Sequence, residues 1–263
     1  MPNSPISFVV ADGAPPAVAH GFSTRQGGVS TGVFFSNNMH DKKGDSTENV
    51  LENRQRFLSA IGLDPRNLFI VEQVHGVDLL DVDARLPGET PDLEYDGLVS
   101  GRPGFTVGVT TADCLPVLLA ARNGRAVAGL HAGWRSLVAG IIPRGVAAVC
   151  AKAACGPDEV WAAVGPGIGP CCFEIGPEVV AQFLEHGFPE RFFHASASGR
   201  PHGDLAGMAV WDLSRAGVTE PRRLPGCTFC EPDKYYSYRR DGWPNGLLLS
   251  VIGIRESAQK EAR

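Results

Sequence analysis

The 263-residue chain lacks the features that define several large classes of protein. No apolar run approaches the roughly 20 residues that a membrane-spanning helix needs. The opening residues, MPNSPISFVV, carry no basic region ahead of a long apolar segment, so no signal peptide is expected. We therefore expect a cytoplasmic protein that does not have a membrane as a partner.

An excess of positive charge is also missing. The chain has 24 Lys and Arg against 29 Asp and Glu, which gives a net charge of −5, and its sequence pI is near 5.8. The pairs Arg222–Arg223 and Arg239–Arg240 are too short to form a basic surface. Nucleic acid is therefore not expected as a partner.

Cysteines are too few and too irregular for a disulfide framework. Seven are present, an odd number with uneven spacing, and the 43% hydrophobic content can form a core without them. Reduced thiols in the cytoplasm fit this pattern. A phosphate loop ending in GKS or GKT, a G-x-S-x-G nucleophile elbow and internal repeats are missing as well.

The elements that are present alternate between strands and helices. Several neighbouring strands are joined by loops too short for a helical crossover, which argues against a purely parallel sheet. The pattern predicts one α+β domain over residues 1–263, with mixed β-sheets flanked by helices. Strands are expected at 8–10, 68–74, 77–82, 105–109, 116–121, 126–130, 160–164 and 247–254, and helices at 46–61, from 135 to about 153 with a kink or start near Pro143, at 177–186 and at 204–217.

Reactive side chains stand where several of these strands end. Cys114 follows Asp113 in TTADCLP, His131 leaves an apolar strand in LHAGWR, and His75 ends another strand in EQVHG. A Cys and a His on neighbouring strand ends can act as nucleophile and base or as two metal ligands. The three together make a possible zinc or copper site with an open position, although Cys and His are also common in cores.

Two other patterns suggest a metal or a nucleotide but fit poorly. Cys227-x-x-Cys230 has zinc-knuckle spacing, yet no second pair follows it. Cys171 and Cys172 are adjacent and are not expected to bind one ion together, so a structural four-cysteine site is disfavoured. The glycines of residues 165–169 are crowded by Pro166 and Pro170 and predict a shaped turn near the site, not a dinucleotide loop.

Two arginine-containing stretches are candidates for binding a ligand. Arg25 precedes Gly27 and Gly28, which suggest either a surface turn or a tight loop that approaches a ligand. Tyr238 and Arg239 lie in YYSYRR, which reads as a plain strand or as a site for an anion or a ring.

Six motifs stand in order along nearly the whole chain. They are GFSTR at 21–25, EQVHG at 72–76, TADCLP at 111–116, HAGWR at 131–135, GPGIGP at 165–170 and YSYRRD at 236–241. With them the chain resembles the YfiH or laccase-domain family, also called the multicopper polyphenol oxidoreductases. It differs from the common pattern in Ser136, where Gly is frequent, and in Asn245-Gly246-Leu247, where Thr-Gly-Arg is frequent.

The resemblance implies an α+β domain with a Cys–His site and a metal, zinc or sometimes copper, on His75, Cys114 and His131. It also implies phosphorolysis of purine nucleosides (adenosine, inosine, guanosine and methylthioadenosine) and adenosine deamination. Purine nucleosides and phosphate are then the partners. Arg25 or Arg239 would hold phosphate, Tyr238 would contact substrate, and Asp113 would orient a ligand imidazole.

Three other functions stay open. A metal-free cysteine amidase acting in peptidoglycan editing would use Cys114 as nucleophile, His131 as base and an oxyanion hole near Gly133. A copper polyphenol oxidase needs many His ligands, and only seven dispersed His occur. A metal-binding protein without catalysis is the third. Either a monomer or a small homo-oligomer is expected.

Overall fold

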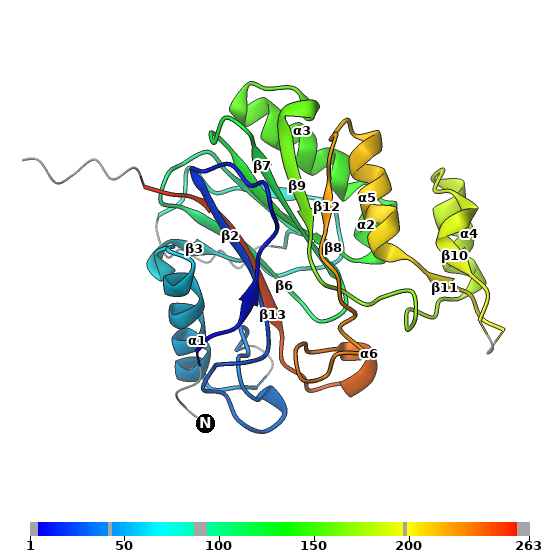
Figure 1. Ribbon diagram of the computed structural model, residues 1–263, viewed down its shortest axis with the longest axis horizontal. Coiled ribbons are helices and arrows are strands. Elements are labelled where there is room, and N and C mark those ends of the chain that lie inside the picture. Colours follow the sequence, from blue (N-terminus) through cyan, green and yellow to red (C-terminus); the bar gives the residue numbers. More distant parts are fainter. Residues whose placement is uncertain (1–4, 42–43, 87–93, 197–198, 257–263) are drawn as a thin grey trace, which may run out of the picture.

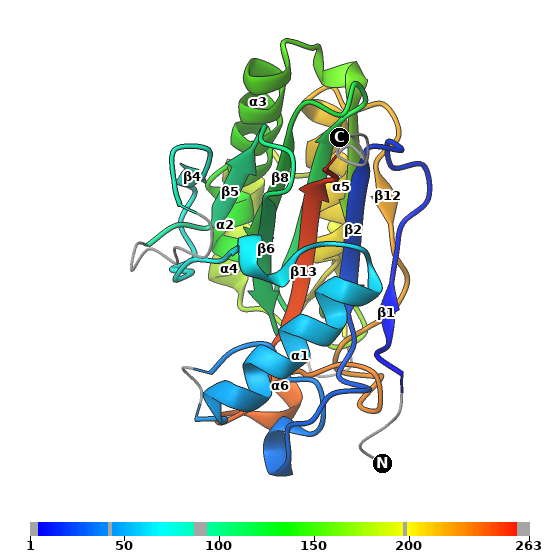
Figure 2. The same cartoon turned by 90° about the vertical axis from the view of Figure 1, so that its left-hand side faces the viewer.

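Two β-sheets pack face to face at the centre of the fold, with helices outside both (Figures 1 and 2). The computed structural model describes residues 5–41, 44–86, 94–196 and 199–256. The strands are β1 Phe8–Val9, β2 Val18–Ser23, β3 Leu68–Phe69, β4 Leu79–Asp81, β5 Gly97–Ser100, β6 Thr106–Thr111, β7 Leu115–Ala121, β8 Val127–Ala132, β9 Val160–Val164, β10 Phe193–His194, β11 His202–Gly203, β12 Arg222–Arg223 and β13 Leu248–Ile254. The α-helices are α1 Thr47–Ala60, α2 Trp134–Val138, α3 Ile141–Ala153, α4 Pro177–Glu185, α5 Leu205–Arg215 and α6 Tyr238–Asp241.

Both large sheets are mixed, as the short connections predict. The five-stranded sheet has the order β1-β2-β13-β6-β3, and the six-stranded sheet has the order β12-β9-β7-β8-β5-β4. The pairs β3/β6, β4/β5 and β12/β9 are parallel, and the remaining pairs are antiparallel. Strands β10 and β11 form a separate hairpin-like pair.

Strand alternation divides the apolar side chains among three layers of core. On β7, Leu118 and Ala120 face the five-stranded sheet, whereas Val117 and Leu119 face the helices α3 and α5. On β13, Ile252 points between the sheets, while its neighbours pack against α1. Successive side chains of a strand point to opposite faces of its sheet. Because both faces of the central strands are covered, both sets of side chains are apolar, which explains the nearly continuous apolar sequences.

Most of the predicted elements are present. The strands at 8–10, 77–82, 105–109, 116–121, 126–130, 160–164 and 247–254 and the predicted helices correspond to structural elements within a few residues, and Pro143 lies in the first turn of α3. The strand predicted at 68–74 is confined to β3, Leu68–Phe69. Within the predicted loop 83–95, residues 87–93 lie outside the described residues.

Two segments differ from the sequence-based expectations. No strand was expected at residues 18–23, yet they form the buried strand β2, Val18–Ser23, which pairs with β1 and β13 although it contains Gly and His. The strand suggested for YYSYRR is a loop that ends in the short helix α6, because the Ser237 side chain accepts a hydrogen bond from the Arg240 N–H and caps the helix.

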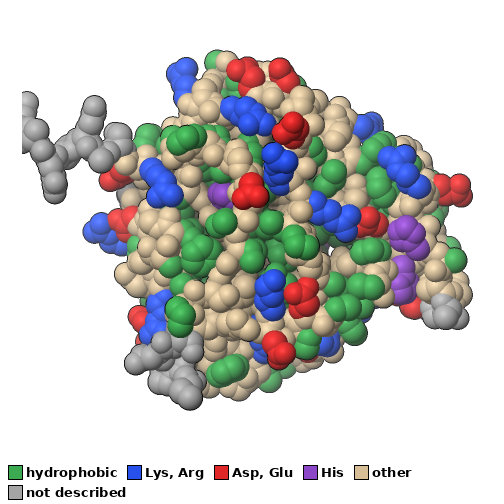
Figure 3. Space-filling model, viewed as in Figure 1, with side chains coloured by type: hydrophobic (Ala, Val, Ile, Leu, Met, Phe, Trp, Pro, Cys, Tyr) green, Lys and Arg blue, Asp and Glu red, His purple; other side chains and the backbone are tan. Residues whose placement is uncertain are grey.

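The surface carries mixed charge, and blue and red side chains are interspersed over the face in Figure 3. Within the described part of the chain, no helix has the length and apolar character to cross a membrane.

Candidate metal and substrate site

His75, Cys114 and His131 come together at one end of the two sheets. The three potential ligand atoms all lie within 4.8 Å of one another. Cys114 lies in the connection from β6 to β7, where the chain crosses from one sheet to the other, and His131 lies on β8 opposite Pro116 of β7. His75 comes from the loop between β3 and β4, and its ring centroid is 4.8 Å from that of His131. The predicted convergence is therefore present.

The carboxylate of Asp96 ties the two histidines together. Its Oδ1 lies 2.7 Å from Nδ1 of His131 and accepts a 2.9 Å hydrogen bond from the His75 N–H. The same carboxylate accepts the N–H groups of Val74 and Gly76, and Asp96 has no solvent exposure. A carboxylate on Nδ1 leaves Nε2 of His131 for the centre of the cluster, which is the arrangement of a metal-bound histidine.

Charge and burial perturb both imidazoles. Burial opposes protonation of His131, but its interactions with Cys114 and with the Asp96 carboxylate outweigh it and raise the pKa of His131 to about 9. Burial, followed by the charges of His131 and Arg135, lowers the pKa of His75. These opposite shifts belong to two groups in direct contact, which is typical of a functional site.

Three local features bring the His75 loop up to Cys114. Gln73 pairs with the backbone of Thr110 on β6 through bonds of 2.7 and 2.8 Å, which fixes the loop against the sheet. His75 has φ 62°, a left-handed conformation that is costly for a residue other than glycine. A Cβ at Gly133 would lie 2.6 Å from Nδ1 of His75 and 3.1 Å from Sγ of Cys114, so only glycine fits there.

A cavity of about 680 Å³ opens beside the three residues. This size lies in the range of small-molecule sites. The lining combines apolar, aromatic and cationic side chains, and it includes His40, Val71, Trp134, Arg135, Ile168, Phe173, Leu205, Tyr238 and Arg239 with His75, Cys114 and His131. Tyr238 and Arg239, predicted as substrate-binding residues, thus lie at the site.

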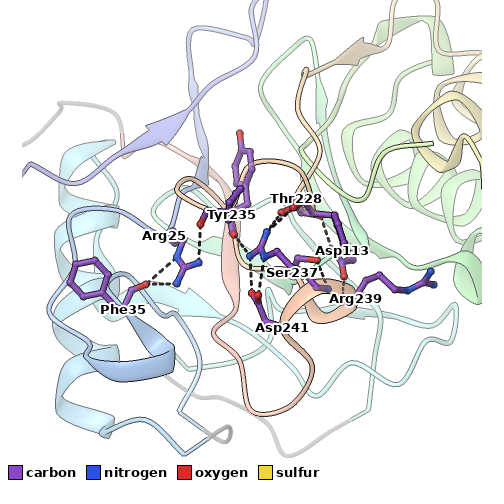
Figure 4. Close-up of polar contacts among 11 residues, drawn as sticks. Arg25, Phe35, Asp113, Thr228, Tyr235, Ser237, Arg239 and Asp241 are labelled. Atoms are coloured by element: carbon purple, nitrogen blue, oxygen red, sulfur yellow. Dashed lines mark hydrogen bonds and ion pairs between the residues drawn. The ribbon is translucent and has the colours of Figure 1, made fainter. Parts of the chain in front are cut away.

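Asp113 lies in the cavity wall with φ 95° and joins the β6–β7 connection to the C-terminal segment (Figure 4). Its carboxylate accepts bonds of 2.6 Å from the Thr228 hydroxyl and from the Arg239 N–H. The expectation that Asp113 orients a ligand imidazole is not met, because Asp96 occupies that role and both oxygens of Asp113 are bonded elsewhere. Asp113 instead positions the residues that carry Arg239.

Arg25 does not reach the cavity, contrary to the prediction that it holds phosphate. Its guanidinium donates to the carbonyl oxygens of Phe35 and Pro232 and lies 4.6 Å over the ring centroid of Tyr236. Figure 4 shows it turned toward Phe35, away from Asp113 and Arg239. Gly28 likewise packs against its own chain, because a Cβ there would lie 2.3 Å from the Ser36 oxygen. The loop therefore supports the fold.

The structure brings together a second group of potential ligands, which the sequence disfavoured. The thiols of Cys171, Cys172, Cys227 and Cys230 lie within 4.8 Å of one another. The adjacent Cys171 and Cys172 both approach a third thiol, since Sγ of Cys230 lies 3.5 Å from that of Cys171 and 3.3 Å from that of Cys172.

Asp96, Gln73, His40 and Arg135 were not among the predicted site residues. A carboxylate directly before the apolar strand β5 was the only sequence signal for Asp96, and Arg135 stands within the HAGWR motif. Gln73 stands within the EQVHG motif. His40 carries no local signal, because only the tertiary fold brings its segment to the cavity.

The donor set fits a metal ion. Two imidazoles and one thiol provide three protein ligands, one imidazole is oriented by a carboxylate, and the fourth side opens into the cavity. Three ligands with an open position are the pattern of catalytic zinc.

These observations define a class of protein, namely a mixed-sheet α/β domain with a three-ligand Cys–His site beside a substrate-sized cavity. Residues 19–255 match the family described as multi-copper polyphenol oxidoreductase laccase, and the chain belongs to that laccase-domain, or YfiH, family.

Several relatives in this family are similar to the chain over almost their whole length. A Deinococcus radiodurans protein named purine nucleoside phosphorylase is 39% identical over 94% of both chains. The Escherichia coli protein named purine nucleoside phosphorylase YfiH is 38% identical over 91% of this chain and 95% of its own. The solved structure of Geobacillus stearothermophilus YlmD has a TM-score of 0.84 and 29% identity, and it covers 96% of this chain and 100% of that one.

Proposed function

We propose that this chain is a metal-dependent purine nucleoside phosphorylase. The reaction joins orthophosphate to C1′ of adenosine, inosine, guanosine or methylthioadenosine, breaks the C1′–N9 bond and releases the purine and a pentose 1-phosphate. One observation carries the proposal: the His75–Cys114–His131 cluster borders the same cavity as Phe173 and Arg239. The names of the relatives support it.

The cavity offers separate surfaces for the two substrates. Phe173 and Trp134 provide aromatic faces, and Ile168 and Leu205 add apolar contact, which suits a purine ring. Arg239 donates through Nη1 to the backbone carbonyl oxygen of Glu174 at 3.1 Å, which orients the guanidinium. Its other N–H groups can bind phosphate in a fork.

Arg135 is a second phosphate ligand candidate. It borders the cavity with its guanidinium carbon 4.3 Å from the Trp134 ring centroid, so its position is set by stacking. His40 is a cavity residue outside the proposed ligand set, and its imidazole is a candidate proton donor to the departing purine.

His75, Cys114 and His131 would hold the metal, zinc or alternatively copper. A bound zinc ion supplies Lewis acidity and lowers the pKa of a bound water to roughly 7. Asp96 fixes the His131 ring, and Gly133 allows the ligands to approach closely. Because the site is open, adenosine deamination is proposed as a side activity of the same cavity.

The test compares inosine with and without phosphate, using purified protein loaded with zinc. Hypoxanthine and ribose 1-phosphate are measured for the wild type, Cys114→Ala and Cys150→Ala, the last being a control because Cys150 lies on α3, outside the cavity lining. Phosphate-dependent products that disappear only in Cys114→Ala support the proposal. Equal activity in Cys114→Ala and the wild type would refute it.

A cysteine amidase is the rival, since Cys114 and His131 are neighbours. Such a dyad has no need of His75, whose imidazole also points into the cluster at the cost of a strained backbone. A covalent acyl adduct on Cys114 after incubation with a cell-wall peptide would favour the amidase. The copper oxidase is less consistent, because the described residues gather only two His and one Cys at one centre, and their other ligand cluster contains cysteine alone.

A further inference from the structure

We propose that Cys171, Cys172, Cys227 and Cys230 bind a structural zinc ion, separate from the His75–Cys114–His131 site. Four thiols whose sulfur atoms all lie within 4.8 Å of one another match the donor set of a structural zinc site. This second site can be tested without an activity assay.

A turn explains how adjacent cysteines face the same point. The N–H groups of Cys172 and Phe173 both donate to the Gly169 oxygen at 3.0 Å, which curls the chain after β9. Sγ of Cys230 lies 3.5 Å from Sγ of Cys171 and 3.3 Å from Sγ of Cys172. Zinc–sulfur bonds of about 2.3 Å in a tetrahedron place sulfurs roughly 3.8 Å apart, so a small adjustment accommodates the ion.

The second pair reaches the cluster from the segment after β12. Gly167 and Cys227 form a parallel bridge, and the Thr228 N–H donates to the Gly167 oxygen at 3.1 Å. The Gly169 N–H donates to Sγ of Cys227 at 3.2 Å. A backbone N–H on a cysteine sulfur stabilises the thiolate, which is the form that binds metal.

Zinc binding at this cluster is a balanced step. Each sulfur gives a lone pair to Zn²⁺, the thiol protons pass to solvent, and no electron is transferred. Four thiolates select zinc over the hard cations, and four protein ligands leave no open position. The cysteines also lie outside the lining of the 680 Å³ cavity, which fits a structural role.

The zinc would hold the C-terminal segment against the β6–β7 connection, which carries Asp113 and Cys114. Thr228, next to Cys227, donates to Asp113 at 2.6 Å, and its carbonyl accepts from Arg240 at 2.6 Å. Asp113 precedes Cys114 and binds the Arg239 N–H. In Figure 1 the segments after β9 and β12 run together toward α6. Losing the ion is expected to loosen this connection.

The first experiment measures zinc per chain after expression with zinc and purification under reducing conditions. We expect about two zinc ions in the wild type, with one lost in Cys227→Ser/Cys230→Ser and one lost in Cys114→Ala. The matched control is Cys150→Ser/Cys155→Ser, which removes two cysteines outside either cluster and should keep both ions. A wild type with one zinc that Cys114→Ala loses would overturn the proposal.

A second measurement does not depend on the folding of the double variant. X-ray absorption on zinc-loaded Cys114→Ala reports the remaining site, and we expect a shell of four sulfurs at about 2.3 Å without a nitrogen shell. A nitrogen-containing shell would contradict the assignment. If the wild type binds no second zinc and its intact mass, measured without reduction, is lower by two hydrogens, the four cysteines hold a disulfide in place of the ion, which would overturn the proposal.

Discussion

The two sulfur-containing clusters of this protein differ in composition and in surroundings. The His75–Cys114–His131 cluster combines nitrogen with sulfur and borders a cavity, whereas the Cys171–Cys172–Cys227–Cys230 cluster contains sulfur alone and lies outside that cavity. Three ligands leave room for a substrate or water, and four complete a tetrahedron. The comparison teaches that the number of ligands and access to a cavity separate a catalytic from a structural assignment.

The two clusters are nevertheless connected through Asp113. Its carboxylate binds Thr228, which follows Cys227. Its chain neighbour Cys114 belongs to the His75–Cys114–His131 cluster, which is named the open cluster below. One hydrogen bond therefore links the chain segments that carry the two clusters.

The largest effect is expected from Cys114→Ala. Removing one of three ligands removes the metal and its Lewis acidity, which is worth several kcal/mol, so kcat/KM for inosine phosphorolysis should fall about 10³-fold. The cluster of Cys171, Cys172, Cys227 and Cys230, named the all-cysteine cluster below, should keep its zinc. Steady-state kinetics and elemental analysis check this, and a variant that retains most of its activity would exclude Cys114 from the site.

Asp96→Asn should have the next largest effect. The change keeps the shape but weakens the hold on Nδ1 of His131, and loss of such a carboxylate lowers metal affinity about 10- to 100-fold. Competition with a chelator measures the affinity. Asp83→Asn is the control, because Asp83 binds Ser100 and Lys152 away from the cavity and should leave the affinity unchanged. Equal losses in both variants would indicate general destabilisation.

Arg239→Ala and Arg25→Ala should separate substrate binding from support of the fold. Arg239 borders the cavity, so its loss should raise the KM for phosphate about tenfold, as expected for one charge-assisted hydrogen bond. Arg25 binds two backbone oxygens outside the cavity, so its loss should lower the melting temperature and leave that KM unchanged. The opposite outcome would restore Arg25 as the phosphate ligand.

The smallest effect is expected from Gly169→Ala, beside the all-cysteine cluster. The new Cβ would lie 3.3 Å from Sγ of Cys171 and 3.4 Å from Sγ of Cys227, a tight contact that a small shift relieves. A cost of about 1 kcal/mol should lower the melting temperature by roughly 2–4 °C. Gly133→Ala at the open cluster should instead impair activity, because its Cβ would lie 2.6 Å from His75. Thermal scans and kinetics of both variants test this contrast.

The sequence predicted the central elements and the open cluster for identifiable reasons. Strands β6 to β9 are continuous apolar runs bounded by turns, and Cys114 and His131 stand at the ends of such runs. His75 was found because its motif ends a predicted strand, although that strand is shorter than expected.

The failures share a physical cause, which is dependence on contacts distant in the chain. Strand β2 is specified by pairing with β13, more than 200 residues away, and not by its own composition. The four cysteines meet only because β12 runs beside β9 and brings Cys227 next to Gly167. Arg25 matched a family motif, but only the folded chain shows that backbone oxygens occupy its guanidinium.

The pairing of β7 with β8 limits how the chain can change in length. Pro116 lies opposite His131, so the position of the imidazole relative to Cys114 is set by strand register and not by the turn at the far end of the hairpin. Insertions at residues 122–126 can lengthen that turn without moving the site. Deleting one residue within β8 would rotate His131 to the opposite face of the sheet, toward α3, and abolish the cluster. Length variation is therefore tolerated at the tip of this hairpin and excluded along its strands.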